Sequence, residues 1–525
     1  MKALNMKAFV SVVLVFMLAI TAACSSTNTG RGSDTTGSES NKPEKIVELK
    51  SITMGTEPQT GMDEFYKQLD ELTVKDLGAK IRFDFIPWGD EKNQISRAIV
   101  AKEYDLYVGG GWSDYPSFAQ KNAFADLKPL LGEVPELVKH YNGALERVEL
   151  GGKLFGIPQF GKPGAGGEGV LYREDLRKEW NLPEIKDFAS LEQYLYKAKE
   201  EFPDTPMIND PRVGYRIFQM IAGGKYIFNP LTQMQGTAFT VSTLDNPYKA
   251  INVYETPEFK EAVTIAQKWY KDGIIAHDIL AAQGNETDKT KQLMLAGQKP
   301  LEFSNHFWAV SGAYVPAIKV EHPDYEFGWL DFTLDMAPAN VWMPQLTLDT
   351  TAISVGAHSK YPEIALKFIE KAHTDRTYYD LLQYGVSGIH YNFVDGVVNY
   401  DGIADKNRRP GWTGLNDGFM NYKSKYPGEW QAYADKMEQE GAPLAEKNGV
   451  YPYEGFFFNT SGLSAELSSL ETARTQYIQP WSAGVIKKSI DEDLEAAMKQ
   501  LKAAGLDKYM EELQKQLDEF AAAKK

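Results

Sequence analysis

Three glycines followed by an aromatic and an acidic residue form the pattern most typical of a ligand contact in this sequence. Residues 109–114 are Gly-Gly-Gly-Trp-Ser-Asp, and they follow residues 104–108, which we expect to form a strand. Glycine lets a ligand approach the backbone closely, so Trp112 and Asp114 would project toward that ligand. Alternatively, the glycines only form a turn, Trp112 packs on the next helix and Asp114 is its N-cap.

Motifs for catalysis, metal binding and nucleotide binding are not found. The seven histidines show neither an HExxH motif nor a paired-ligand spacing, which argues against a catalytic zinc site. The glycine-rich residues 161–169 lack the GxGxxG spacing and the Lys-Ser/Thr ending of a phosphate loop. Because no nucleophile elbow or evident acid/base pair stands out either, we expect no cofactor and no enzymatic activity.

The N-terminus has the features of a bacterial export signal. Lys2 and Lys7 precede an apolar stretch, residues 8–23, that ends in Thr21-Ala22-Ala23 directly before Cys24. This ending resembles a lipobox, although the position three before the cysteine is usually Leu. We expect a signal peptide over 1–23 and lipidation of Cys24, the alternative being a plain signal peptide with a chance cysteine.

Composition limits the remaining possibilities. Cys24 is the only cysteine, which excludes internal disulfides and thiolate metal clusters. The net charge of −16 opposes binding to nucleic acid. Residues 24–45 are rich in Ser, Thr, Gly and Asn and indicate a flexible tether. A chain of 525 residues exceeds one hydrophobic core and predicts two lobes.

Strands and helices are expected to alternate at the start of the mature chain. An alternating strand over 46–54, a helix through Phe65, Leu69 and Leu72, and a strand over 81–86 predict a βαβ unit. A helix over 91–101 and the strand over 104–108 follow. Alternation of this kind implies an α/β sheet with ligand-binding loops at strand ends.

Further elements are predicted along the rest of the chain. Residues 170–176 should start a strand and helix, and residues 258–272 a helix that Gly273 ends. Two C-terminal helices have apolar repeats from Ile486 and from Leu506, separated by Gly505. Their mixed charges indicate packing on a lobe rather than on a membrane.

Short sequence segments, in the same order along nearly the whole mature chain, resemble those of family 1 extracellular solute-binding proteins, the sugar-binding lipoproteins of ABC transporters. The segments lie at 104–107, 152–158, 171–176, 295–298, 352–369 and 384–391. The resemblance implies a two-lobe α/β fold of the class II periplasmic-binding-protein type, with a hinge, a ligand cleft and added C-terminal helices. We expect lobe 1 over 46–160 and 348–395, lobe 2 over 161–347 and 396–485, and a helical extension over 486–525.

The resemblance also implies a function. The protein would capture an oligosaccharide and deliver it to the permease subunits of an ABC importer. It would be a monomer, held by an acyl chain such as palmitate on the extracellular face of the cell membrane. A carbohydrate offers hydroxyl groups and weakly apolar faces, so its sites combine aromatic side chains with polar hydrogen-bonding residues.

Residues 303–308, Phe-Ser-Asn-His-Phe-Trp, lie where this family often has a stacking aromatic residue. We expect a ligand contact from Asn305 and from one of His306, Phe307 or Trp308. For His306, the alternatives are a metal ligand or a structural histidine.

Other candidates for ligand contact lie near strand ends, helix starts and turns, with core packing as the alternative for the aromatic residues. Arg173 could instead form a salt bridge within its own helix. These candidates are Glu57, Gln59, Arg173, Tyr215, Arg216, Trp342, Tyr391 and Trp412.

Two other functions remain open at this stage. Aromatic and carboxylate residues in a cleft also describe a glycoside hydrolase, in which two carboxyl groups would cleave the polysaccharide. A surface adhesin would bind a polymer without supporting sugar uptake.

Overall fold

The computed structural model describes most of the chain after the tether. The described residues are 46–524, apart from 89–90, 111–112, 114, 159–166, 228–239, 282–285, 308–309, 311–313, 344–350, 416–419, 426–429, 455, 457 and 461. They form two principal sheets with separate hydrophobic cores.

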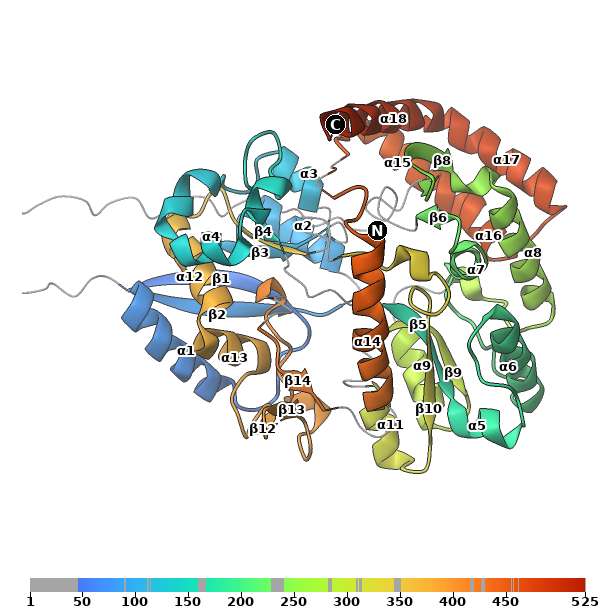
Figure 1. Ribbon diagram of the computed structural model, residues 1–525, viewed down its shortest axis with the longest axis horizontal. Coiled ribbons are helices and arrows are strands. Elements are labelled where there is room, and N and C mark those ends of the chain that lie inside the picture. Colours follow the sequence, from blue (N-terminus) through green and yellow to red (C-terminus); the bar gives the residue numbers. More distant parts are fainter. Residues whose placement is uncertain are drawn as a thin grey trace, which may run out of the picture. The chain divides into compact units, whose positions relative to one another are not determined.

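The first sheet begins with the predicted βαβ unit. Strands β1 (Val47–Met54) and β2 (Ala79–Ile86) pair in parallel and are joined by helix α1 (Met62–Leu77) (Figure 1). Phe65, Leu69 and Thr73 lie one turn apart on the buried face of α1. Gly78, in the left-handed conformation with φ 64°, ends the helix. The prediction is confirmed.

Three more strands complete this sheet. Its order is β2-β1-β3-β11-β4, with β11 antiparallel to both of its neighbours. Helix α2 has the predicted limits, whereas β3 starts at Leu106 rather than at residue 104. The bounds are Glu91–Ala101 for α2, Leu106–Gly109 for β3, Ile157–Pro158 for β4 and Ala352–Val355 for β11.

Helices and a small sheet, β12-β13-β14, accompany the first sheet. Helix α12 contacts both α1 and β11. The helices are α3 (Tyr115–Gln120), α4 (Pro135–Tyr141), α12 (Pro362–Thr374) and α13 (Arg376–Tyr384), with 3-10 turns at Lys128–Glu133, Ala144–Val148, Asp405–Asn407 and Thr413–Leu415. The small sheet contains β12 (Asn392–Val394), β13 (Val397–Asn399) and β14 (Lys423–Ser424).

Residues 397–415 return to the first core, although the sequence placed residues 396–485 in the second lobe. Val398, Trp412 and Leu415 are buried in the core that β1 and β2 share. The Trp412 indole donates to Ser51 Oγ at 3.2 Å, and Thr413 Oγ1 accepts from the Met54 backbone at 2.8 Å. These contacts with β1 hold the segment against the first sheet. The sequence did not predict this position, because local periodicity does not reveal contacts between such distant segments.

The second sheet is antiparallel and covered on both faces. Its order is β10-β5-β9, with bounds Glu168–Arg173 for β5, Leu301–His306 for β9 and Phe327–Asp331 for β10. Alternate side chains of a strand point to opposite faces. Accordingly, Val170 and Tyr172 belong to one core cluster, whereas Leu171 belongs to another.

Helices α7 and α8 belong to the first of these clusters, and α11 and α14 to the second. The strand and helix expected over 170–176 are β5 and α5, and Gly273 follows α8 as predicted. The helices are α5 (Glu174–Glu179), α6 (Phe188–Glu201), α7 (Val213–Ala222), α8 (Pro257–Lys271), α9 (Glu286–Leu295), α11 (Val315–Glu321) and α14 (Trp430–Asn448), with 3-10 turns at Val253–Glu255, Ile279–Ala281 and Pro338–Asn340. A small sheet contains β6 (Tyr226–Ile227), β7 (Thr240–Thr243) and β8 (Asn246–Asn252).

The C-terminal helices pack on the second core, as predicted. They are α15 (Ser464–Ala473), a π-helical turn (Arg474–Ile478), α16 (Gln479–Ser482), α17 (Ile490–Ala503) and α18 (Leu506–Ala523). Gly505, with φ 103°, makes the turn between α17 and α18. Figure 1 shows α18 beside β8 and α15, and α18 contacts both.

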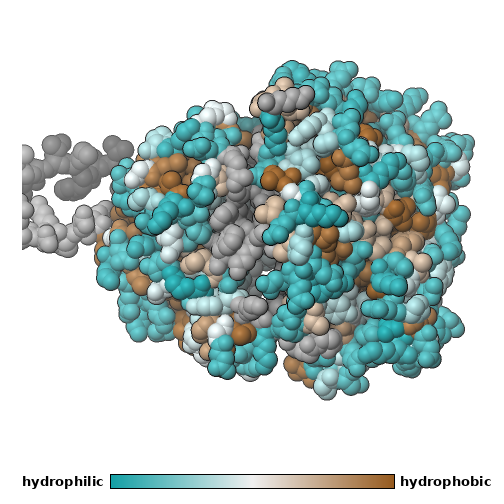
Figure 2. Space-filling view, in the orientation of Figure 1, coloured by the Kyte–Doolittle hydropathy of each residue, from teal (hydrophilic) through white to brown (hydrophobic). Residues whose placement is uncertain are grey.

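The face of the protein drawn in Figure 2 is mainly polar. On the face drawn in Figure 2, hydrophilic side chains predominate and hydrophobic ones form small separate groups. Among the described helices, none combines the length and the apolar character that crossing a membrane requires.

The His390 side chain links the loop after β1 to the loop after α13 by two hydrogen bonds. Its Nδ1 accepts from the Val386 backbone at 2.9 Å, so its Nε2 carries the hydrogen and donates to Thr60 O at 2.9 Å. Burial lowers the pKa of His390, and the nearby Arg409 charge adds to this effect. Protonation would place a second donor against the Val386 N–H.

We therefore expect protonation of His390 at acidic pH to lower the free energy of unfolding. Its folded-state pKa lies below the ordinary value of about 6.5, so the unfolded state binds more protons below that pH and stability falls as pH falls. Urea unfolding at pH 7.5 and 5.0 should show a larger loss for the wild type than for His390→Gln. Equal losses would contradict this role.

Candidate functional site

Strand pairing in the second sheet brings two polar segments together. Glu168, the first residue of β5, lies opposite His306, the last residue of β9. The backbone of Glu168 accepts from Phe332 N at 2.9 Å, and Asp331 Oδ2 accepts from Gly167 N at 3.1 Å. These bonds fix the start of β5 and with it the direction of the Glu168 side chain.

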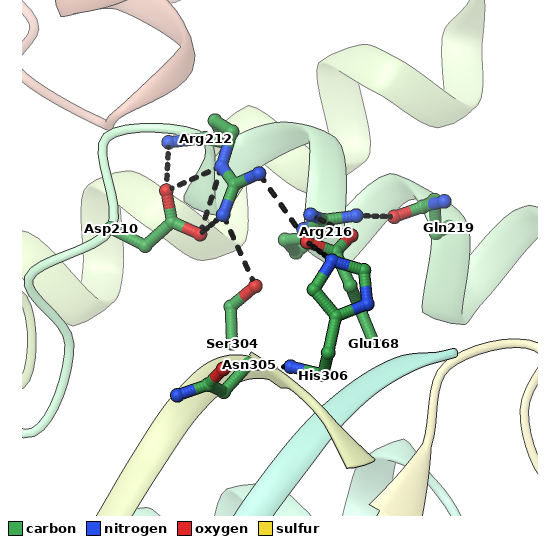
Figure 3. A network of polar contacts seen from close by, with 8 residues as sticks. All are labelled: Glu168, Asp210, Arg212, Arg216, Gln219, Ser304, Asn305 and His306. Carbon is green, nitrogen blue, oxygen red and sulfur yellow. Dashed lines mark hydrogen bonds and ion pairs between the residues drawn. The ribbon is translucent and has the colours of Figure 1, made fainter. Parts of the chain in front are cut away.

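A partly buried ion pair joins Glu168 to helix α7. Arg216 Nη2 donates to Glu168 Oε2, and Arg216 Nη1 donates to Gln219 Oε1 at 2.8 Å (Figure 3). The Arg216 guanidinium also lies 5.6 Å from the centre of the Phe332 ring. Three elements, β5, α7 and the segment after β10, thus hold this arginine in place.

A second arginine extends the network. Arg212 precedes α7 and binds Asp210 with two nitrogens, Nε to Oδ1 at 3.0 Å and Nη2 to Oδ2 at 3.0 Å. Its Nη1 reaches Glu168 Oε1 at 3.4 Å, and its Nη2 reaches Ser304 Oγ at 3.4 Å. Figure 3 shows Arg212 between Asp210 and Glu168, above the end of β9.

The cations keep both carboxylates of this network ionised. Burial alone would raise the pKa of Glu168, but the charges of Arg216, Arg212 and His306 outweigh it and lower the pKa. Burial likewise opposes ionisation of Asp210, and Arg212 and Arg216 reverse this, so its pKa is also lowered. Both side chains act as acceptors rather than as acids at neutral pH.

The end of β9 supplies further polar groups. His306 is exposed, with its Nε2 3.8 Å from Glu168 Oε1. Asn305 Oδ1 accepts from the His306 backbone at 2.8 Å, and within the described part of the chain its buried Nδ2 has no partner. Together the eight residues can make several hydrogen bonds to one polar ligand.

The structure groups three predicted residues in this network and shows others that the sequence did not single out. Asn305, His306 and Arg216 are joined in it. Tyr215 precedes Arg216 in the chain and is buried on α7. The residues not predicted are Glu168, Asp210, Arg212, Gln219 and Ser304. For Glu168, the available signal was a carboxylate within a glycine-rich run at the start of a predicted strand.

The predicted polar residues near other strand ends lie apart from this network. Glu57 and Gln59 are exposed on the loop after β1, where Gln59 N donates to Lys406 O at 3.1 Å. Arg173 lies at the opposite end of β5 from Glu168. It forms an ion pair with Asp175 and lies 3.1 Å from the centre of the Tyr325 ring, so the salt-bridge alternative is the one observed.

Predicted aromatic contacts occupy core positions in several cases. Trp412 is fully buried between Phe83 and Phe368, with ring centres 5.8 and 5.2 Å away. Its faces are covered, so the expectation of a ligand contact there is corrected to the alternative, core packing. Phe307 is also fully buried, against Trp329 and Trp430.

Two further aromatic candidates pack against tyrosines. Tyr391 is buried with its ring 5.4 Å from that of Tyr384, and the partly buried Trp342 lies 6.0 Å from Tyr451. Neither touches the network of Figure 3. Trp112, Asp114, Trp308 and Cys24 lie outside the described residues.

In the described ranges, no group of three or more His, Cys, Asp or Glu side chains could hold a metal ion. The network pairs its carboxylates with arginines, an arrangement suited to hydrogen bonding rather than to cation binding.

Comparison with known proteins gives two family matches. Residues 59–376 match the family model described as bacterial extracellular solute-binding protein, and residues 452–522 match a domain of unknown function, DUF3502. A carbohydrate ABC transporter substrate-binding protein from Streptococcus pneumoniae serotype 4 (strain ATCC BAA-334 / TIGR4) is 23% identical over 531 residues, covering 99% of each chain.

Solved structures show the same fold. The N-glycan transport solute-binding protein NgtS from Streptococcus pneumoniae, in complex with Man1GlcNAc, has a TM-score of 0.65 at 20% identity, covering 90% of this chain and 99% of that one. The alginate-binding protein AlgQ2, in a structure without calcium ion, has a TM-score of 0.58 at 16% identity, covering 91% and 99%. The expected two-lobe α/β fold is thereby confirmed. The first family model matches more than half of the length of this chain, which therefore belongs to the bacterial extracellular solute-binding proteins.

Proposed function

We propose that this protein captures an oligosaccharide outside the cell and delivers it to an ABC importer. The observation that carries the proposal is the network at the ends of β5 and β9, where Arg212 and His306 are exposed beside two fixed carboxylates. The name of the pneumococcal relative and the glycan bound to NgtS support the same ligand class.

The chemistry of the network suits a sugar. Each sugar hydroxyl both donates and accepts, and it binds best where charged groups hold fixed positions. Because the ion pairs with Asp210 and Glu168 orient Arg212 before the ligand arrives, little side-chain entropy is lost on binding. Aromatic side chains would cover the apolar faces of the sugar rings.

We favour binding without turnover over glycoside hydrolysis. A glycosidase needs one carboxyl group with a raised pKa as its general acid, whereas the pKa values of Glu168 and Asp210 are lowered. Burial raises the pKa of the nearby Glu302, but this side chain is enclosed in the core beside Tyr314. Incubation with oligosaccharides should leave them intact by mass spectrometry, and released products would contradict the proposal.

We also propose that the mature protein is a monomer attached to the outer face of the membrane through Cys24. The signal peptide over 1–23, the lipobox-like ending and the polar tether over 24–45 support this attachment. Labelling with a fatty-acid analogue tests it, with Cys24→Ala as the unlabelled control. Retention of that variant in the membrane fraction would contradict it.

Trp112 and Trp308 are the aromatic residues that we propose as stacking surfaces. Their sequence positions, after a triple glycine and after His306, support this role. Replacing either with alanine should cost about 1 to 3 kcal/mol of binding free energy and leave the melting temperature nearly unchanged. Calorimetric titration of each variant measures the loss, and unchanged affinity in both would exclude the two residues as the stacking surface.

A further inference from the structure

The exposed groups of the Figure 3 network are donors, whereas its acceptors are shielded. The side chains of Arg212 and His306 are 54% and 66% exposed, those of Asp210 and Glu168 only 13% and 21%. A ligand that reaches the network therefore meets a guanidinium and an imidazole first.

The carboxylates of Asp210 and Glu168 already accept hydrogen bonds from donors of the protein itself. Asp210 accepts from Arg212 through Nε, Nη2 and the backbone N–H, and Glu168 accepts from Arg216 and Arg212. A neutral sugar that needed a carboxylate acceptor for paired hydroxyls would have to displace one of these bonds. Ion pairs of this kind are expensive to break when partly buried.

Donors are also in excess inside the network. Arg216 is 4% exposed, and its Nε has no partner among the described residues, as is true of Asn305 Nδ2. Buried donors without acceptors are costly, so the network is short of acceptor atoms. A ligand carboxylate would bring two acceptor oxygens and a negative charge.

The geometry points to an acidic saccharide, one bearing a uronate or sialate carboxylate, as the preferred ligand, with that carboxylate held by Arg212 and His306. This inference rests on the proposed function and narrows its ligand class. Arg212 uses Nε and Nη2 for Asp210 and Ser304 and one Nη1 hydrogen for Glu168, so its second Nη1 hydrogen and the His306 ring are the groups left to a ligand. A carboxylate accepts from such donors more strongly than a neutral hydroxyl group does.

The overall charge of −16 does not decide against an acidic ligand. At physiological ionic strength charges are screened over about 8 Å, so distant acidic residues act weakly at the network. The local donors dominate at contact distance. Binding of the acidic ligand should weaken as salt concentration rises, because part of the attraction is between exposed charges.

Matched ligand pairs test the inference by calorimetry on the mature protein. The pairs are a galacturonic acid tetrasaccharide with its carboxyl-reduced counterpart, and a sialylated glycan with its desialylated counterpart. We expect at least one acidic member to bind about 10- to 100-fold more tightly than its neutral partner, the ratio given by a charge-assisted hydrogen bond. Arg212→Gln should weaken binding of both members, because Arg212 belongs to the binding network, but it should weaken the acidic member more and so remove most of that ratio.

Two variants accompany this experiment. His306→Gln should reduce the same ratio without disturbing the fold, since the side chain is exposed. Lys225→Gln removes an exposed cation that pairs with Glu258 away from the network and should leave the ratio unchanged. Circular dichroism verifies that each variant is folded.

Neutral members binding as tightly as the acidic ones would overturn the inference and leave the proposed function standing. A loss in Arg212→Gln that is equal for both members would overturn it too. Absence of binding to every saccharide tested would instead overturn the proposed function itself.

Discussion

Deleting the residues after Gly484 should unfold the second core. The deletion removes α17 and α18, whose buried side chains belong to that core, namely Leu494, Ala497, Met498, Leu501, Leu506, Tyr509, Leu513 and Leu517. Burying one large apolar side chain contributes about 1.5 to 3 kcal/mol. Losing several of them, on the order of 10 kcal/mol, is comparable with the whole stability of a typical domain, about 5 to 15 kcal/mol.

Specific hydrogen bonds would be lost with the packing. Gln514 pairs with the edge strand β8, accepting from Ala250 N at 3.0 Å and donating to Tyr248 O at 2.9 Å. The Trp481 indole donates to Ile490 O at 2.9 Å. The truncated protein should therefore aggregate or lose its cooperative melting transition.

A shorter truncation provides the control for this deletion. Removing the residues after Phe520 deletes the largely exposed last turn of α18 and the hydrogen bond from Lys524 to Pro452 O, and should nearly keep the wild-type melting temperature. Neither truncation should release the protein from the membrane, because the proposed anchor is Cys24. A protein shortened after Gly484 that stays as stable and soluble as the full chain would show that the helices are a separate appendage.

Replacing Trp412 with alanine should destabilise the first core by about 3 to 5 kcal/mol, the usual cost of truncating a buried tryptophan. The side chain is 1% exposed, packs between Phe83 and Phe368, and bonds Ser51 on β1. The cavity would lie directly against the βαβ unit. Denaturant unfolding followed by fluorescence or circular dichroism measures the loss.

Comparing Trp412→Ala with the replacement of an exposed tryptophan distinguishes a packing role of Trp412 from a ligand contact. Trp88 is 58% exposed, so Trp88→Ala should leave the free energy of unfolding nearly unchanged. Under conditions in which Trp412→Ala remains folded, its ligand affinity should equal that of the wild type. Unchanged stability combined with weakened binding would make Trp412 a ligand contact after all.

The elements that the sequence predicted well are those fixed by local patterns. The buried stripe of α1, the strands on either side of it and the turn at Gly505 follow from apolar spacing and from glycine conformation over a few residues. The packing of α17 and α18 could be expected for the same reason, because amphipathic helices need a partner for their apolar face.

The network was only partly predictable because it depends on contacts between distant segments. Arg216, Asn305 and His306 were candidates individually, but nothing local to the sequence pairs Glu168 with His306 across β5 and β9. Asp210 and Arg212 occur in an ordinary-looking loop before a helix and gain their role from that pairing. Trp412 shows the converse: its position near a turn suggested exposure, and the return of the chain to β1 buries it.

Calorimetric titration of the mature protein with oligosaccharides, combined with product analysis of the same mixtures, tests whether this protein binds sugars without cleaving them. We expect saturable one-to-one binding of at least one oligosaccharide, with the ligand recovered intact. Turnover of the bound sugar, or no binding across neutral and acidic oligosaccharides by a protein that is demonstrably folded, would contradict it.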